Sequence, residues 1–205
     1  MIKRKKKFIY LISPNKIVGN NFFRYLDEIF YSKKVKFFQL RLKKAKNTKI
    51  VNIGKKIKKI CIKHKVKLIV NDSPKIAIKV GADGCHIGQN DISIKKARKI
   101  LKNKIMGVTC HNSIKLVKAA ISNKANYIAL GSFYTTKTKK IKLKAKISTI
   151  KRVKKITNVP VVAIGGINST NFKKLLLNKA DFLAISSFIW KNKKLKPIEA
   201  IKQIK

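Results

Sequence analysis

The acidic residues of this chain are few and unevenly placed. The sequence has 7 Asp and Glu residues, and Asp72, Asp83 and Asp91 all fall in the stretch VNDSPKIAIKVGADGCHIGQND at residues 70–91. Carboxylate oxygens are ligands that Mg²⁺ prefers, and Mg²⁺ often clamps a diphosphate while water and phosphate oxygens complete its shell. We therefore predict that Asp72 and Asp91 hold Mg²⁺. Asp83, inside GADG, is expected in a turn or cap before a strand.

Cations are available to bind the phosphate oxygens beside such a metal ion. Arg41 carries a planar guanidinium that suits phosphate, and Lys43 follows two residues later on the same side of an extended strand. Lys139 follows the run TKT at residues 136–138, whose two hydroxyls can donate hydrogen bonds. These residues predict a site that neutralises charge on a departing group.

Two later pairs predict a second anion site. Gly165 and Gly166 follow one apolar run, and Ser186 and Ser187 follow the next. Glycines let backbone N–H groups approach a phosphate, and hydroxyls can complete the cradle. Close packing of a strand against a helix also favours glycine, so the glycine pair alone is a weak signal.

The cysteines and histidines do not form a zinc motif. Cys61, Cys85 and Cys110 contain no CxxC pair, and their number is odd, which favours a reducing compartment. Cys85 precedes His86 and Cys110 precedes His111, but adjacent residues on a strand point to opposite faces, so neither pair easily shares one ion. We expect His86 and the cysteines in the core or barrel wall, and His111 at a strand end that could contact substrate.

Eight short apolar runs alternate with segments of helical spacing. Alternation of this kind predicts a parallel sheet, and eight units close most naturally into a single compact (β/α)8 TIM barrel of the α/β class, with a doubly wound open sheet as the alternative. Active sites of such barrels lie at the carboxyl ends of the strands, where the polar residues above are found. The runs are FIYLIS (8–13), FFQLRL (37–42), KLIVND (67–72), GCHIG (84–88), KIMGVTC (104–110), YIALGSF (127–133), VPVVAIGG (159–166) and FLAISSF (182–188).

Length and charge set the remaining limits. We expect residues 1–205 to form one domain, with residues 1–7 as a frayed basic tail. The 52 Lys and Arg residues give a formal net charge of +45, but they are nearly all lysine and spread over every segment, which disfavours nucleic-acid binding as the main role. Nothing resembles a signal peptide or a membrane span, so a cytoplasmic location is expected.

Seven motifs together resemble those of the thiamine phosphate synthase family, whose members are (β/α)8 enzymes. The similarity extends from residue 10 to about residue 190, and the motifs occur in the family's order and spacing. Leu42 replaces an acid usual in the first motif, Thr109 replaces a serine, and Ser132 replaces a proline. The motifs are QLRLK (39–43), VND (70–72), GADGCHIGQND (81–91), GVTCH (107–111), GSFYTTKTK (131–139), VPVVAIGGI (159–167) and ADFLAISSFI (180–189).

The resemblance implies a transferase that joins hydroxymethylpyrimidine diphosphate to a thiazole phosphate or carboxythiazole phosphate. Diphosphate would leave in a Mg²⁺-assisted dissociative step, with Asp72 and Asp91 as the metal ligands. The implied catalytic residues are Arg41, Lys43, Lys139 and Thr109. The implied substrate-binding residues are Gln39, Leu40, Arg41, Leu42, Lys43, Asn71, Thr109, Thr136, Lys137, Thr138, Lys139, Gly166, Ser186 and Ser187.

Two other functions compete with this interpretation. A thiazole tautomerase-like isomerase on the same barrel would use His111 as its acid and base and would need no diphosphate site. A basic binding protein with a vestigial barrel would show salt-dependent affinity for DNA instead of turnover. We expect small-molecule substrates, no nucleic acid and no membrane as partners, and leave a homo-oligomer open.

Overall fold

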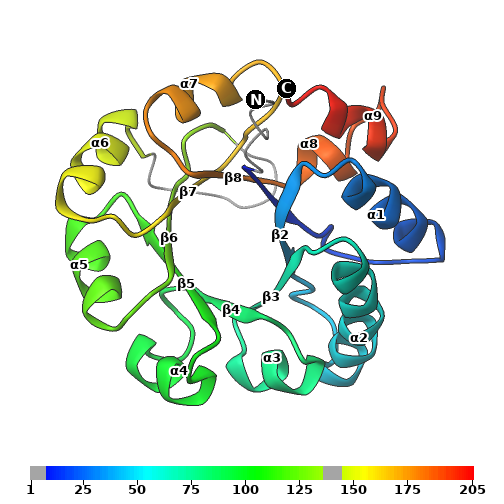
Figure 1. Cartoon of the computed structure of the whole chain (residues 1–205), viewed down its shortest axis with the longest axis horizontal. Coiled ribbons are helices and arrows are strands. Elements are labelled where there is room, and N and C mark those ends of the chain that lie inside the picture. Colours follow the sequence, from blue (N-terminus) through cyan, green and yellow to red (C-terminus); the bar gives the residue numbers. More distant parts are fainter. Residues whose placement is uncertain (1–7, 136–144) are drawn as a thin grey trace, which may run out of the picture.

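The strands of this protein close into a barrel. The computed structural model describes residues 8–135 and 145–205, and the eight parallel strands in these ranges pair in chain order, with β8 returning to β1 (Figure 1). The predicted TIM barrel is therefore confirmed, and the open sheet is excluded. The strands are β1 (Ile9–Ile12), β2 (Val35–Leu40), β3 (Lys67–Asn71), β4 (Gly84–Ile87), β5 (Ile105–His111), β6 (Tyr127–Gly131), β7 (Val161–Ile164) and β8 (Phe182–Ile185).

Helices surround the barrel as an outer ring (Figure 1). None of the helices in the described ranges combines the length and apolar character that a bilayer crossing requires. They are α1 (Asn21–Tyr31), α2 (Asn47–Lys63), α3 (Pro74–Val80), α4 (Ile94–Leu101), α5 (Ile114–Ser122), α6 (Ile147–Ile156), α7 (Phe172–Leu177), α8 (Ser187–Trp190) and α9 (Pro197–Lys202).

The strands bury both of their faces, which is why they occur as continuous apolar runs in the sequence. On the outer face, Cys85 and Ile87 of β4 belong to the large core that the helices cover. On the inner face, Tyr10, Tyr127 and Val162 belong to a separate cluster that fills the barrel. Side chains alternate between these two layers along each strand, so adjacent residues have different surroundings.

Short connections hold the carboxyl ends of the strands close to the helices that follow them. Ser73, Ser93 and Ser113 occupy the N-cap positions of α3, α4 and α5. Each serine oxygen accepts a hydrogen bond of 3.3 Å from the backbone N–H three residues later. These caps satisfy amides that the first helical turn leaves unpaired.

Asp83 has the structural role that its sequence setting predicted. It lies directly before β4, where its carboxylate accepts hydrogen bonds from the Leu68 N–H at 2.9 Å and from Lys58 Nζ at 2.7 Å. Burial acts to raise the pKa of Asp83, but the hydrogen bonds from Lys58 and from the Leu68 N–H lower it overall.

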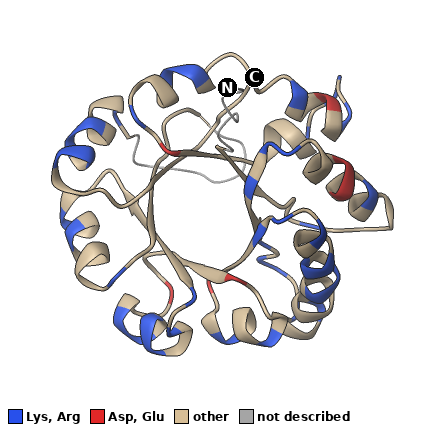
Figure 2. Cartoon of the chain, viewed as in Figure 1, with Lys and Arg blue, Asp and Glu red and all other residues tan. Residues whose placement is uncertain are grey.

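The positive charge is distributed around the whole molecule. Figure 2 shows Lys and Arg around the whole ring of helices rather than on one face.

Candidate active site

A cavity of about 380 Å³ opens at the carboxyl ends of the strands. It brings together the described residues that were predicted to form the site, apart from Leu40 and Leu42. The predicted site residues in its wall are Gln39, Arg41, Lys43, Asn71, Asp72, Asp91, Thr109, Gly166, Ser186 and Ser187. The predicted residues Thr136, Lys137, Thr138 and Lys139 lie outside the described residues.

Asp72 and Asp91 face one another in this cavity. Their carboxyl groups are close enough to share a hydrogen bond. Asp72 follows β3 in a left-handed conformation, with φ of 67°, and its N–H donates to the His86 carbonyl at 2.8 Å. One Asp91 oxygen accepts the Gly88 N–H at 2.7 Å. The backbone therefore fixes both acids at neighbouring strand ends.

The contact between these two acids changes their electrostatics. Burial raises the pKa of Asp72 to about 6, and Asp91 acts in the same direction through a hydrogen bond and through its charge. Lys43 and Arg41 oppose this increase. Two carboxylates held side by side repel each other, and a divalent cation between them would relieve that repulsion.

The donor set suits Mg²⁺ better than zinc. Within the described residues, no group of three His, Cys, Asp or Glu side chains is arranged to hold a metal. A metal here would therefore take Asp72 and Asp91 from the protein and its other ligands from water and substrate oxygens. Mg²⁺ binds in this way, whereas structural zinc requires four protein ligands.

Arg41 borders the acid pair. Its backbone N–H donates to Ser13 Oγ at 2.9 Å, and its Nη1 donates to Asn15 Oδ1 at 3.1 Å. Burial lowers the pKa of Arg41, while the charge of Asp72 acts in the opposite direction. The guanidinium is thus held at the rim by the loop after β1, near enough to the acids to share an anion with them.

Leu40 and Leu42 are placed differently from the other predicted binding residues. Both side chains are buried in the core beneath the helices and do not line the cavity. Alternation explains the separation, because Gln39 and Arg41 take the positions that face the cavity.

Glycines shape the opposite wall. Gly165 and Gly166 have φ values of 107° and 61°, a region that side chains rarely adopt. A Cβ on Gly166 would also collide with the Thr135 carbonyl. Ser186 Oγ donates to the Ser13 carbonyl at 3.2 Å, and Ser187 begins α8. The predicted phosphate residues therefore surround one part of the cavity.

His111 lies at the end of β5, where the strand's register shifts, and it lines the cavity with a φ of 50°. Its expected position at a strand end is confirmed.

The expectation for His86 was incomplete. The side chain is buried, but it also lines the cavity and bonds to two hydroxyls, Tyr127 Oη at 3.0 Å and Thr109 Oγ1 at 2.8 Å. Burial lowers the pKa of His86 to about 4, so its ring is neutral. Strand alternation indicated that His86 and Cys85 face opposite sides, but nothing in the sequence indicated these partners.

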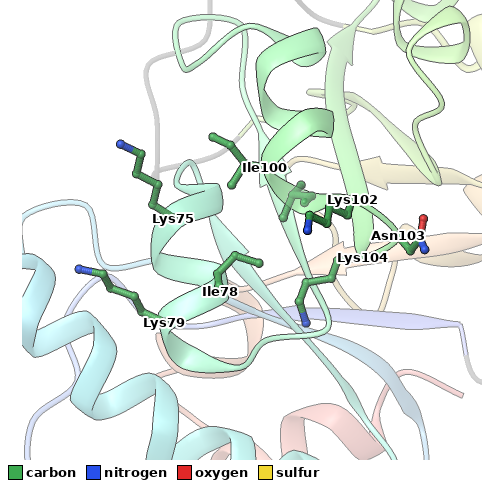
Figure 3. Close-up of a pocket in the computed structure, with 8 residues that line it drawn as sticks. Lys75, Ile78, Lys79, Ile100, Lys102, Asn103 and Lys104 are labelled. Carbon is green, nitrogen blue, oxygen red and sulfur yellow. The ribbon is translucent and has the colours of Figure 1, made fainter.

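A second hollow, of about 650 Å³, lies between α3 and the end of α4 (Figure 3). Its wall is formed by lysines such as Lys75 and Lys79 and by aliphatic side chains such as Ile78 and Ile100. Among the described residues that line it, none carries an acid or a hydroxyl, so they do not supply the groups that the predicted chemistry requires.

Comparisons with known proteins find relatives that match nearly the whole chain. A family model described as thiamine monophosphate synthase matches residues 9–189. A thiamine-phosphate synthase of Pelagibacter ubique is 62% identical over 203 residues, covering 99% of this chain and 98% of that protein. One of Clostridioides difficile is 35% identical over 185 residues, covering 89% of this chain and 87% of that protein.

A solved structure agrees at the level of the fold. The thiamine phosphate pyrophosphorylase of Pyrococcus furiosus superposes with a TM-score of 0.85 at 24% identity, covering 98% of this chain and 95% of that one. The family match and the two sequence relatives extend over nearly all of the barrel. This chain therefore belongs to the thiamine monophosphate synthase family.

Proposed function

We propose that this transferase joins hydroxymethylpyrimidine diphosphate to a thiazole phosphate, releasing diphosphate and forming thiamine phosphate, with Mg²⁺ as cofactor. The observation that carries the proposal is the contact between the carboxyls of Asp72 and Asp91, with Arg41 and Lys43 in the same cavity. Paired acids beside paired cations suit a metal-bound diphosphate.

Arg41 and Lys43 would bind the diphosphate and stabilise the charge that develops as it leaves. The carbon–oxygen bond to diphosphate breaks, its electron pair leaves with the oxygen, and the pyrimidine ring stabilises the resulting cation. A bound Mg²⁺ would supply further positive charge to the departing oxygens, with Asp72 and Asp91 as its ligands.

The second substrate would bind against the opposite wall of the cavity. That wall is lined by two glycines and two serines, Gly165, Gly166, Ser186 and Ser187. Backbone amides and hydroxyls there suit the phosphate of a thiazole phosphate. With this phosphate bound, the thiazole nitrogen would lie over the pyrimidine methylene carbon and donate the electron pair of the new carbon–nitrogen bond.

Thr109 and His86 raise a covalent alternative, because a hydroxyl bonded to an imidazole can act as a nucleophile. His86 is a weak base here, since burial lowers its pKa to about 4. In the dissociative reaction Thr109→Val should therefore retain part of the turnover, whereas complete loss in a folded variant would indicate a covalent step.

The test is direct. Purified protein with Mg²⁺ and both substrates should form thiamine phosphate, and Asp72→Asn and Asp91→Asn should each abolish most of this activity. Asp27→Asn is the matched control, because Asp27 pairs with Lys63 and His64 between α1 and α2, away from the cavity. Retention of full activity in the Asp72 and Asp91 variants would refute the proposal. Isomerase activity that survives Asp91→Asn but not His111→Ala would favour the tautomerase.

A further inference from the structure

A chain of hydrogen bonds joins five side chains that line the cavity at the mouth of the barrel. Gln39 Nε2 donates to Tyr10 Oη at 3.1 Å, and Tyr10 Oη lies 2.7 Å from Tyr127 Oη. Tyr127 Oη lies 3.0 Å from His86 Nδ1, and His86 Nε2 lies 2.8 Å from Thr109 Oγ1. The first four side chains are at most 8% exposed although they border the cavity, so their hydrogen bonds are made mainly to one another.

Gly107 makes this chain sterically feasible. In the sheet register, Gly107 lies between His86 on β4 and Tyr127 on β6. A Cβ at Gly107 would collide with the Tyr127 ring. Because β5 contributes no side chain at this level, the rings of His86 and Tyr127 stack across it, with centroids 5.6 Å apart and an interplanar angle of 19°.

The first donor sets the direction of the whole chain. With the Gln39 amide oriented as it is, its nitrogen can only donate, so Tyr10 accepts from Gln39 and the side-chain oxygen in reach of its own proton is that of Tyr127. Tyr127 then donates to His86 Nδ1. A neutral imidazole that accepts at Nδ1 carries its proton on Nε2, which donates to Thr109.

The last proton of the chain remains available in the cavity. In this direction Thr109 Oγ1 accepts from His86, and no other partner for this oxygen is found among the described residues. Its own hydroxyl proton is therefore free to donate to an anion. The reverse direction would leave the Tyr10 proton without an acceptor among the described side chains unless Gln39 turned its carbonyl oxygen toward Tyr10.

We propose that Tyr127 and His86 are positioning residues that fix the direction of this chain and so present the Thr109 hydroxyl as a hydrogen-bond donor to the diphosphate. The inference rests on the proposed function only in naming diphosphate as the acceptor. The direction of the chain is a property of the protein alone and can be measured without substrate.

Nitrogen NMR of protein labelled at histidine measures that direction. The protein has 3 histidines, and the signals of His86 are those that vanish in His86→Gln. The proposal expects the proton of His86 on Nε2, and a mixture of tautomers once Tyr127→Phe removes the donor to Nδ1. A proton on Nδ1 in the unsubstituted protein would overturn it, because Thr109 would then donate to His86.

A double-mutant cycle tests the link to the anion, with inorganic diphosphate and Mg²⁺ as the probe. Tyr127→Phe should weaken diphosphate binding about two- to tenfold when Thr109 is present. It should have almost no effect in a Thr109→Val background, and the matched control Tyr25→Phe on α1 should have none in either. Equal losses in both backgrounds would overturn the proposal. If the enzyme formed no thiamine phosphate, the proposed function would fail, but the NMR result would still decide the direction of the chain.

Discussion

Replacement of Asp72 by Asn should stabilise the metal-free protein while it abolishes activity. In the native state Asp72 lies beside Asp91, and burial together with this neighbour raises its pKa from 3.8 to about 6. The folded protein therefore binds the proton of Asp72 more tightly than the unfolded chain does. The stabilisation from this group is present at low pH and is lost as the pH rises from about 4 to about 6.

The size of the effect follows from the pKa difference. A change from 3.8 to about 6 corresponds to at most about 3 kcal/mol of destabilisation above pH 6. Asp72 is only half-buried, and solvent screening reduces this figure to about 1–2 kcal/mol. Asparagine has the size of aspartate and tolerates the left-handed conformation at this position, so the substitution removes charge without adding backbone strain.

Thermal unfolding in EDTA across a pH series is the assay. We expect Asp72→Asn to raise the melting temperature by about 2–8 °C at pH 7.5, relative to the unsubstituted protein, and the gain to fade toward pH 4. Asp27→Asn is a control that should lower the melting temperature at pH 7.5 instead, because hydrogen bonds from His64 and Lys63 lower the pKa of Asp27 and so stabilise its charged form in the folded protein. A melting temperature for Asp72→Asn at or below that of the unsubstituted protein at pH 7.5 would refute the assignment of a repelling acid pair.

Three further substitutions test other parts of the structure. In steady-state assays Arg41→Met should lower kcat/KM about 100-fold, because Arg41 lines the cavity. The control Arg152→Met, on an exposed part of α6, should leave kcat/KM unchanged. Equal effects of the two substitutions would contradict the placement of Arg41. Gly107→Ala should cost about 1–3 kcal/mol in urea unfolding because of the collision with Tyr127, and a neutral result would contradict that packing. Arg98→Met should lower the free energy of unfolding by about 2–3 kcal/mol in the same assay, because the Arg98 guanidinium donates to four acceptors in the loops after α4 and α5. A loss under about 0.5 kcal/mol would show that these hydrogen bonds contribute little.

The barrel was predictable because its strands are buried on both faces. A parallel strand covered by helices on one side and filled by side chains on the other becomes a continuous apolar run, such as KLIVND, with its polar residue at the carboxyl end. That rule alone places Asp72 at the mouth of the barrel. It also separates Asp83, which precedes a strand and lies at the opposite end, from the acids of the site.

The chain of hydrogen bonds from Gln39 to Thr109 could not be predicted, since its members meet only through the closure of the barrel. His86 and Tyr127 lie on strands that are not neighbours, and they touch because Gly107 between them has no side chain. Leu40 and Leu42 show the converse problem. They lie within a motif that resembles a binding segment, but alternation directs their side chains into the core, and a role in substrate binding stays a prediction.

Calorimetric titration with hydroxymethylpyrimidine diphosphate tests the central claim most directly, because it measures binding at the acid pair without requiring turnover. We predict tight binding in the presence of Mg²⁺, much weaker binding in EDTA, and loss of the metal-dependent part in Asp91→Asn. Equal affinity with Mg²⁺ and with EDTA, or an unchanged dependence on Mg²⁺ in Asp91→Asn, would contradict the claim that Asp72 and Asp91 hold a metal that binds the diphosphate.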